Sequence, residues 1–356
     1  MSTSTIDEAV AVRDGEALDA AAVHAFLRDR IDGLSGEPEV RQFAGGASNL
    51  TYLLRWPDRE LILRRPPLGT KAKSAHDMLR EANIMSRLKP VFGKVPEVLA
   101  TCDDESVIGG EFYVMERLRG IIPRRNLPRD LALSAEDTQQ LCTNVVDTLI
   151  ELHAVDHVAA GLDDIGKGEG YVRRQIEGWT ERYARARTWN VLPMRRVTRW
   201  LAERMPEHES ICLIHNDFRF DNVVLDPDDP LRVIGVLDWE MATLGDPLMD
   251  LGSSLAYWVE AGDGRFAQAS RRQPTHLPGM FTRRELIDYY LERTGRQSVD
   301  FDFYEVYGLF RLAVIAQQIY YRYHHGQTRN PAFRNLWIAV NYLGWRCGRI
   351  IRSATG

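Results

Sequence analysis

The segment that decides the fold is Leu213–Asp250, which reads LIHNDFRFDNVVLDPDDPLRVIGVLDWEMATLGDPLMD. Three short apolar runs lie in it or at its edge, at residues 211–214, 222–225 and 232–237, and each is interrupted or ended by side chains that carry oxygens. Apolar runs of this length favour strands, which would hold those side chains rigidly. The segment therefore predicts strands that present oxygen ligands.

Three side chains of this segment suggest its chemistry. Asn222 follows Asp217 by five residues, and Asp238 closes the third apolar run. Mg²⁺ takes a few carboxylate or carbonyl oxygens and fills the rest of its shell with water and phosphate, so this set suits a hard divalent cation and leaves Asp217 to accept a proton. Asp and Asn are also common in loops, and a lone D-x-x-x-x-N fragment indicates only a loop. The full ordered set, followed by Gly-Asp-Pro, is what favours a catalytic site.

The same segment resembles a known family. HNDFRFDN at 215–222 resembles the H-x-D-x-x-x-x-N catalytic loop of kinases, and VLDWE at 236–240 resembles their metal-binding aspartate segment. With GDPLMDL at 245–251, the pattern is similar to that of the aminoglycoside phosphotransferase-like family, which includes choline kinase.

Carried over residue by residue, the resemblance assigns roles within the segment. Asp217 would be the catalytic carboxylate, and Asn222 and Asp238 would be the metal ligands. His215 would be structural and pack the loop, and the two aspartates of GDPLMD would support the loop through hydrogen bonds.

Length and composition limit the class of protein. The 356 residues, 44% of them hydrophobic, are enough for two domains or for one domain with two lobes. The net charge of −5 and the pI near 6.0 disfavour nucleic acid as the main partner, because phosphate backbones attract basic surfaces. No apolar run is long enough to span a bilayer, and the N-terminus lacks the pattern of a signal peptide. We therefore expect a cytoplasmic protein without a membrane partner, and its scattered cysteines favour reduced thiols.

The sequence before the deciding segment predicts a helix at residues 17–31 and then a hairpin at 39–56 that turns at Gly45 and Gly46. In a kinase-like fold such a turn lies over the nucleotide phosphates, because glycines let backbone amides approach the oxygens. The loop G-G-A-S-N resembles that of the phosphotransferase family, which implies Ser48 and Asn49 as further donors. Taken alone, a Gly-Gly pair indicates only a turn.

The next strand, at residues 60–65, places Arg64 where kinases carry a phosphate-gripping lysine. Arginine keeps the charge and adds a bidentate fork, but it departs from the usual motif. The alternative is a surface Arg-Arg pair that ends an edge strand. In the helix expected at 73–88, the pattern R-E-A-x-x-M-x-x-L resembles the family's helix with an ion-pairing glutamate, which implies that Glu81 holds Arg64. As an isolated fact, a glutamate on an amphipathic helix indicates a solvated charge.

Two more strands are predicted at residues 96–102 and 111–118. YVMERLRG in the second resembles the hinge through which the family binds the nucleotide base. The resemblance implies that Met115 faces the base and that the backbone of Glu116 and Leu118 contacts it.

Beyond residue 120 the pattern becomes helical, beginning with a long helix that Ser134 would cap. Residues 171–205 carry nine arginines among aromatic side chains, although the whole chain is acidic. Two interpretations stay open: helices with solvated arginine faces, or a positive rim that attracts an anionic acceptor or its phosphate groups. The resemblance implies that the C-terminal helices form the acceptor pocket.

These elements predict an α+β chain with a two-lobed protein kinase-like fold, a small antiparallel β lobe followed by a large, mainly helical lobe. The expected boundaries are an N-terminal extension at 1–37, a nucleotide-binding lobe at 38–117, and a lobe with the catalytic loop and acceptor region at 118–356. The implied reaction moves the γ-phosphoryl of ATP or GTP, with Mg²⁺, to a hydroxyl of a small molecule.

The acceptor is expected only as a class. LRRPP, YVMERLRG and HNDFRFDNVVL together look closest to the branch of the family fused to, or named after, acyl-CoA dehydrogenases, which implies a hydroxyacyl acceptor, bound as a CoA thioester. Choline-like alcohols and aminoglycosides are alternatives, although an arginine-rich rim would repel the polycationic aminoglycosides. A catalytically weak nucleotide-binding scaffold or pseudokinase is the other alternative. Arg64 favours it, and the complete set of Asp217, Asn222 and Asp238 opposes it.

Overall fold

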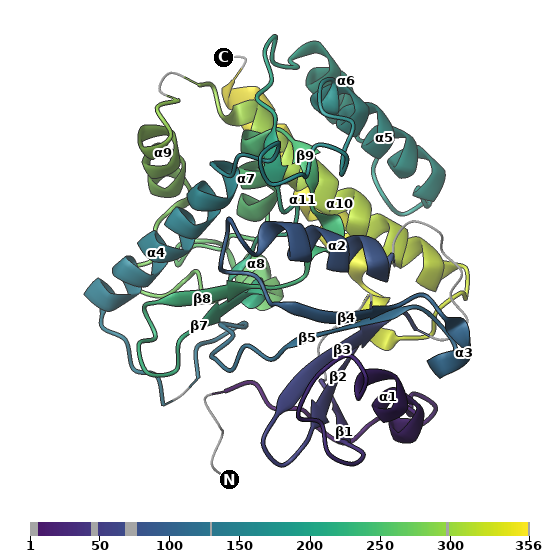
Figure 1. The fold of residues 1–356 in the computed structure, drawn as a ribbon. Coiled ribbons are helices and arrows are strands. Elements are labelled where there is room, and N and C mark those ends of the chain that lie inside the picture. The colour runs from purple at the N-terminus through teal and green to yellow at the C-terminus, as the bar shows by residue number, and fades with distance from the viewer. Residues whose placement is uncertain (1–5, 44–48, 68–76, 129, 297–298, 355–356) are drawn as a thin grey trace. The chain divides into compact units, whose positions relative to one another are not determined.

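The computed structural model describes residues 6–43, 49–67, 77–128, 130–296 and 299–354 (Figure 1). The chain divides into two compact units. The first comprises Met1–Val145, Val158–Leu162 and Phe220–Ala242, and the second comprises Val146–His157, Asp163–Arg219 and Thr243–Gly356. Each unit has its own sheet and its own helices.

The first unit is built on a five-stranded antiparallel sheet with the strand order β1-β2-β3-β5-β4. Its strands are β1 (Glu39–Gln42), β2 (Leu50–Arg55), β3 (Glu60–Arg65), β4 (Val98–Cys102) and β5 (Phe112–Glu116). All five were expected from alternating apolar residues between turn signals. Together with the helical second unit, the sheet confirms the predicted α+β class.

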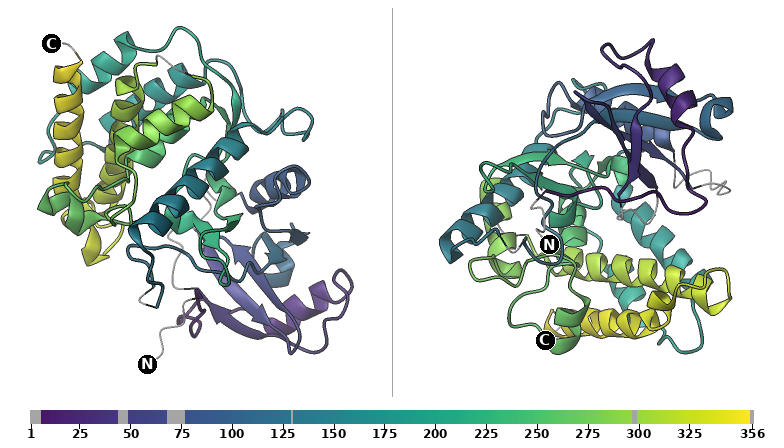
Figure 2. Two further views of the ribbon diagram at one scale, coloured as in Figure 1. Left: turned by 90° about the vertical axis from the view of Figure 1, so that its left-hand side faces the viewer. Right: turned by 90° about the horizontal axis from the view of Figure 1, so that it is seen from below.

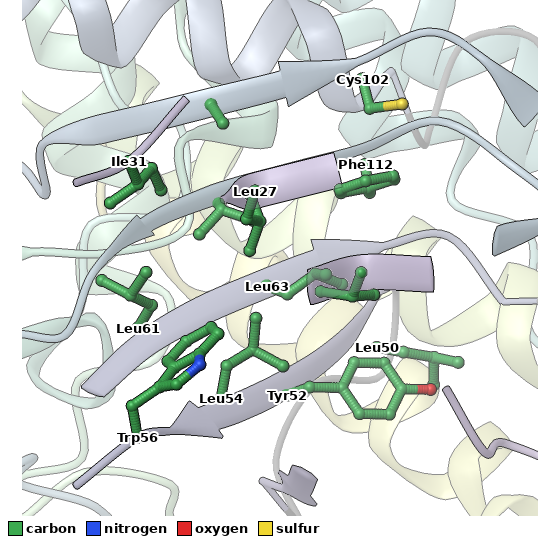
Figure 3. Close-up of a cluster of buried hydrophobic side chains, with 13 residues drawn as sticks. Leu27, Ile31, Leu50, Tyr52, Leu54, Trp56, Leu61, Leu63, Cys102 and Phe112 are labelled. Carbon is green, nitrogen blue, oxygen red and sulfur yellow. The ribbon is translucent and has the colours of Figure 1, made fainter. Parts of the chain in front are cut away.

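One face of this sheet packs against α1 (Ala20–Leu27) and the short α3 (Glu105–Ile108). Figure 3 shows Leu27 near Phe112 and Leu63, with Trp56 at the lower edge of the same cluster. Successive side chains of a strand point to opposite faces, so alternate positions of β2 and β3 fill this core. The remaining positions are left to face the other side of the sheet.

Helix α2 (Met78–Leu88), which lies within the helix expected at 73–88, buries an apolar stripe together with Glu81. Asp77 caps its first turn by accepting the amide hydrogen of Arg80 at 2.8 Å. Strand β3 lies between β2 and β5, and both Arg64 and Arg65 are buried. The alternative of a surface Arg-Arg pair on an edge strand is therefore wrong.

The first unit also contains the middle of the deciding segment. The 3-10 helix η1 (Phe220–Asn222) leads into a hairpin of β7 (Val223–Leu225) and β8 (Val233–Val236), which is followed by η2 (Trp239–Met241). Strand β6 (Cys212–Ile214) belongs to the second unit, where it pairs with β9 (Thr243–Gly245). Three of these strands follow the three predicted apolar runs, whereas β9 was not expected. The residues of β9 show no apolar alternation of their own.

The second unit is mainly helical, as expected. Its helices are α5 (Tyr171–Ala186), α6 (Arg195–Glu203), α7 (Pro247–Leu255), α8 (Arg265–Ser270), α9 (Arg283–Arg293), α10 (Asp302–His324), η3 (Pro331–Phe333) and α11 (Leu336–Ser353). The long helix α4 (Ala135–His153) begins in the first unit and ends in the second. Ser134 caps it by accepting the amide hydrogen of Asp137 at 3.0 Å. Figure 2 shows α10 and α11 packed side by side.

Helices α7 and α10 touch through their backbones. A methyl group added at Gly308 would overlap the carbonyl oxygen of Gly252, and one added at Gly252 would overlap that of Tyr304. Asp246 caps α7 by accepting the amide hydrogens of Leu248 and Met249, and Pro247 begins the helix.

Two expectations from composition can be compared with the fold. The cysteines are buried free thiols, namely Cys102, Cys142, Cys212 and Cys347. Within the part of the chain that the structure describes, the helices are too short or too polar to cross a bilayer.

Candidate active site

The centre of the candidate nucleotide site is a buried arginine held by two carboxylates. Arg64 donates from Nη1 to Oε1 of Glu81 at 2.6 Å and from Nη2 to Oδ1 of Asp238 at 3.0 Å. Arg64 is 9% exposed and Glu81 is fully buried. Although burial by itself favours the neutral form, the negative charge of Glu81 holds the pKa of Arg64 well above its ordinary value. The guanidinium is therefore a permanent, fixed cation.

Glu81 also fixes the backbone beside Asp238. Its Oε1 accepts the amide hydrogen of Trp239 at 3.1 Å, and the Trp239 ring is fully buried against Phe92. Asp238 itself has a φ of 69°, a left-handed conformation that costs energy for any residue with a Cβ. Such strain persists where surrounding contacts impose it, as the Glu81–Trp239 bond does here.

The β7–β8 hairpin brings the two predicted metal ligands to one place. The amide of Leu237 donates to the carbonyl oxygen of Asn222 at 2.8 Å, just beyond the paired residues Val223 and Val236. Asn222 and Asp238 consequently begin and end the same hairpin. A carboxylate and an amide oxygen so placed fit Mg²⁺, which binds proteins through one or two carboxylates and takes further ligands from phosphate and water.

A cavity of about 180 Å³ in the first unit joins these groups to the expected hinge. Its apolar lining comes from Ile62, Met115 and Leu237, and its polar lining includes Arg64, Asn222 and Asp238. It is smaller than the roughly 300–1,000 Å³ of typical ligand pockets. Gly45, Gly46 and Ser48, expected over the phosphates, lie outside the described residues.

The hinge residues line the same cavity but differ in what their backbones offer. The amide of Glu116 donates to the carbonyl oxygen of Glu97 at 2.9 Å, so this amide is not available to a base. The Glu116 side chain accepts from Lys89 at 2.8 Å. Among the described residues, no partner is found for the amide of Leu118, which leaves it able to donate to a base.

Asn49 has a different position from the one its predicted role suggested. Its side-chain amide donates to Oε2 of Glu240 at 2.7 Å, and it is not among the residues that line the cavity. This contact ties the start of β2 to η2. A direct contact between Asn49 and phosphate remains a prediction.

The predicted catalytic loop lies in the second unit. Asp217 accepts from Nη2 of Arg219 at 3.1 Å, and the Arg219 guanidinium lies 4.6 Å from the ring centre of Tyr257. The ring of His215 is buried and its Nδ1 accepts the amide hydrogen of Asp217 at 3.2 Å. His215 thus packs and orients the loop, as its expected structural role requires.

A buried carboxylate anchors this loop. Asp250 accepts the amide hydrogens of His215 and Asn216, each at 2.8 Å. His153 reaches Asp250 through Nε2 at 3.2 Å and the Tyr290 hydroxyl through Nδ1 at 2.7 Å. Because a carboxylate can only accept, Nε2 of His153 carries the proton. Burial by itself raises the pKa of Asp250, but the His153 hydrogen bond and neighbouring charges lower it below its ordinary value.

A buried cation on α10 completes the support of the loop. Arg311 donates from Nη2 to the carbonyl oxygen of Asn216 at 2.9 Å and lies 5.5 Å from the ring centre of Trp179. Asn216 has a φ of 65°, so its backbone is strained and needs this hold.

The arginine-rich region forms α5, α6 and their connection. Eight of its nine arginines are exposed, and on α5 Arg185 pairs with Glu181. Arg182 lies 4.6 Å from the ring centre of Trp179. Both interpretations of this region, solvated faces or an anion-attracting rim, remain compatible with that exposure.

Sequence reasoning missed two groups. Arg219 lies inside the recognised motif, and a cation two residues after a catalytic carboxylate was a signal that could have been used. Asp7 and Arg124 line the cavity of the first unit but belong to no motif. Only tertiary contacts bring residue 7 to a site more than a hundred residues away.

Solved structures place the fold in the class of kinase-like phosphotransferases. A crystal structure from Ralstonia eutropha JMP134, provisionally assigned as an aminoglycoside phosphotransferase, is 30% identical, has a TM-score of 0.77, and is matched over 94% of this chain and 99% of its own. Choline kinase from Cryptosporidium parvum, at 12% identity and a TM-score of 0.63, covers 94% of this chain and 96% of its own and shows the shared fold alone.

The chain belongs to the phosphotransferase enzyme family, whose model matches residues 39–286. This confirms the resemblance seen in the sequence. Mouse acyl-CoA dehydrogenase family member 10 is 37% identical over 321 residues, which are 89% of this chain and 30% of that protein. The chain therefore spans less than half the length of the curated relatives it matches.

Proposed function

We propose that this protein transfers the γ-phosphoryl group of ATP or GTP to a hydroxyl of a small molecule in the cytoplasm. The observation that carries the proposal is the cluster of Arg64, Glu81 and Asp238 at one end of a cavity whose other end is a hinge. A fixed cation beside a carboxylate suits a polyphosphate and its counter-ion. In this arrangement the amide of Leu118 and the side chain of Met115 receive the base.

In the proposed reaction, Asn222 and Asp238 would hold Mg²⁺, which neutralises charge on the transferred phosphoryl group. The Nη2 of Arg64 exchanges its bond to Asp238 for a bond to the phosphates, while Nη1 stays bonded to Glu81. Asp217 orients the acceptor hydroxyl and accepts its proton. The acceptor oxygen bonds to the γ-phosphorus as the bond to the bridging oxygen breaks, and the nucleoside diphosphate leaves.

Arg219 has a role in this scheme that the sequence did not suggest. It donates to Oδ2 of Asp217 at 3.1 Å, and so helps to orient the carboxylate that would accept the hydroxyl proton. Its planar fork of donors also suits the charge of a phosphoryl group.

For the acceptor, we propose a hydroxyacyl compound, including its CoA thioester. The support is the similarity to an acyl-CoA dehydrogenase family member over most of this chain, and the exposed arginines of α5 and α6 that would attract its phosphates. Choline-like alcohols and aminoglycosides remain alternatives, and the same arginines disfavour polycations. The boundaries at 37/38 and 117/118 are likewise part of the proposal.

A second candidate function is a nucleotide-binding scaffold with little turnover. The observation that favours it is the direct bond between Arg64 and Asp238, because it engages an oxygen that a metal would need. If a metal ion takes the place of Arg64 at Asp238, the site can work as a kinase. If Arg64 stays bonded to Asp238, the metal ion cannot bind there and the site cannot turn over.

The test is ATP and GTP turnover with Mg²⁺ against a panel of hydroxyacyl-CoA thioesters, free hydroxy acids, choline-like alcohols, sugars and aminoglycosides. We expect one class of acceptor to stimulate nucleotide turnover by wild type. The control Asp163→Asn, which changes an exposed residue, should match wild type. Asp217→Asn should lose at least a hundredfold in kcat while still binding nucleotide. Equal turnover in wild type and Asp217→Asn would refute the catalytic assignment. Tight nucleotide binding without turnover on any acceptor would favour the scaffold.

A further inference from the structure

We propose that the segment at residues 6–16, here called the N-terminal arm, completes the nucleotide site, and that Asp7 on this arm binds the hydroxyl groups of the nucleotide's sugar. This inference rests on the proposed function, since it needs a nucleotide in the cavity of the first unit. It goes beyond that function because the arm precedes the family match at 39–286.

The arm is fixed along the edge strand β1. Val10 and Gln42 exchange two backbone hydrogen bonds at 2.8 and 2.9 Å, and the side chain of Gln42 accepts the amide hydrogen of Arg13 at 3.0 Å. The hydroxyl of Tyr52, a fully buried side chain, donates to the carbonyl oxygen of Glu16 at 2.6 Å. The arm therefore covers an edge that would otherwise expose unpaired backbone groups.

The start of the arm is held at the cavity by a buried cation. Arg117 has a side chain that is only 4% exposed, and it donates from Nη1 to Glu60 at 2.7 Å and from Nη2 to the carbonyl oxygen of Asp7 at 2.9 Å. Burial raises the pKa of Glu60, but hydrogen bonds and charge from Arg55 and Arg117 lower it below its ordinary value. The anchor is therefore an ionised pair at neutral pH.

Asp7 lines the cavity, and its carboxylate is held there by a second arginine. Arg124 donates to its Oδ2 at 3.0 Å, and both residues line the cavity with Phe43, Gly120 and Ile122. Among the described residues, Oδ1 of Asp7 has no hydrogen-bond partner. The carboxylate is thus oriented by one arginine and has one oxygen available as an acceptor.

The sugar is the part of a nucleotide that matches this carboxylate. Phosphates would be repelled by it, and the base is expected at the apolar lining and the hinge. A ribose presents two neighbouring hydroxyl donors, and acidic side chains bind such hydroxyls in other nucleotide sites. Gly120 and Ile122 follow the hinge directly, so this part of the lining is the one next to the base.

The backbone anchor allows the two roles of the arm to be separated. Arg117 binds the carbonyl oxygen of Asp7, and that group survives any substitution of the side chain. Asp7→Ala should therefore keep the arm in place and remove only the carboxylate. Asp14→Asn, an exposed residue of the same arm, is the matched control.

The experiment measures the Kd of ATP, 2′-deoxy-ATP and 3′-deoxy-ATP by calorimetry, without acceptor. We expect wild type and Asp14→Asn to prefer ATP over at least one deoxy analogue by about tenfold, the scale of one hydrogen bond to a charged group. Asp7→Ala should lose about tenfold in affinity for ATP. It should bind the disfavoured deoxy analogue with the same Kd as wild type. Arg124→Gln should reduce the preference without abolishing it.

Two results would overturn the inference while leaving the proposed kinase intact. One is equal affinity of wild type for ATP and both analogues, and the other is an unchanged preference in Asp7→Ala. A wild type that binds no nucleotide would overturn both proposals. An arm with a purely structural role would change the melting temperature in Asp7→Ala but leave the preference unaltered.

Discussion

Arg64 shows how one residue can serve stability and function at once. Its guanidinium is buried and joins two carboxylates, one fully buried and one at the cavity. Removing one partner of a buried pair leaves a charge without compensation, which costs more than the pair itself contributes. Lysine, a single point charge, cannot bridge both carboxylates in the same way.

We expect Arg64→Ala to lower the free energy of unfolding by about 3–5 kcal/mol, because Glu81 is left buried and uncompensated. Arg64→Lys should lose less, since it keeps a cation near Glu81. Arg41→Ala, which removes an exposed pair with Glu39 in the same unit, should change little. Urea unfolding curves measure the free energy of unfolding of all three variants. An Arg64→Ala curve that overlays that of wild type would contradict the conclusion that Arg64 compensates the buried charge of Glu81.

At the same scale, the sequence predicted the residues that belong to recognisable patterns. The pairing of Arg64 with Glu81 was implied by the resemblance of their strand and helix to those of the family, and the contact is observed. The bond from Arg64 to Asp238 and the engagement of Asn49 by Glu240 were not foreseen. Both join segments more than 170 residues apart, and such contacts depend on the packed fold and leave no local trace in the sequence.

Among the elements, α7 and α10 support the predicted catalytic loop. Asp250 on α7 and Arg311 on α10 hold neighbouring backbone groups of the loop, at His215 and Asn216. The two helices approach closely because both carry glycine at the crossing. Any side chain at that crossing must push the helices apart.

Gly308→Ala should therefore destabilise the second unit by several kcal/mol, about 2–4, through overpacking against Gly252. Gly348→Ala on α11 is the matched control, because its added methyl group would meet only the end of Arg352 at 3.6 Å. The control should gain about 0.5–1 kcal/mol from helix propensity. The measurement is the melting temperature of both variants and of wild type. An equal loss of stability in Gly308→Ala and Gly348→Ala would show that overpacking at the helix crossing is not the cause.

The lowered pKa of Asp250 predicts how acid affects the same support. A carboxyl group with a lowered folded-state pKa stabilises the fold fully above its ordinary value of 3.8, and that contribution is lost as the pH falls through the lower folded-state value. Asp250→Asn should cost about 1–3 kcal/mol at pH 7, because an amide nitrogen meets the donors of the loop.

The measurement is the melting temperature of wild type and Asp250→Asn between pH 7 and pH 3. The gap between them should be constant above pH 5 and narrow below 3.8. Asp163→Asn, which changes an exposed carboxylate of the same unit, should follow wild type throughout. A gap that widens in acid would mean that the sign of the pKa shift is wrong.

The order of the elements was largely predictable, and their ends were less so. Helix α4 was expected from its cap at Ser134, because a cap is a local signal. Strand β9 and helix α3 were missed because neither has enough residues to show a period. The first is defined by its pairing with β6, and the second is ended by Gly109 in a left-handed conformation.

For the molecule as a whole, binding of a nucleotide should appear as stability. A ligand that binds only the folded state adds about 2.7 kcal/mol at a hundred times its Kd. In the proposed function, that gain depends on the metal ligands and not on the catalytic carboxylate. The two roles can therefore be separated without an acceptor.

We expect Mg-ATP to raise the melting temperature of wild type and Asp217→Asn equally. Asp238→Asn should lose most of that shift, because asparagine tolerates the left-handed backbone but supplies no charge to the metal. ATP with a chelator is the control for metal dependence. A full shift in Asp238→Asn would remove this residue from the metal site.

The contacts of Asp250 also bear on how the loop exchanges its hydrogens with solvent. Loop amides usually exchange through small local openings, but those of His215 and Asn216 donate to Asp250, a fully buried carboxylate on α7. Freeing them requires the loop to leave Asp250 on α7 and Arg311 on α10, and the backbone contact between Gly252 and Gly308 holds these two helices together. In deuterated water, these two amides would keep their protons about as long as those at the centre of α10.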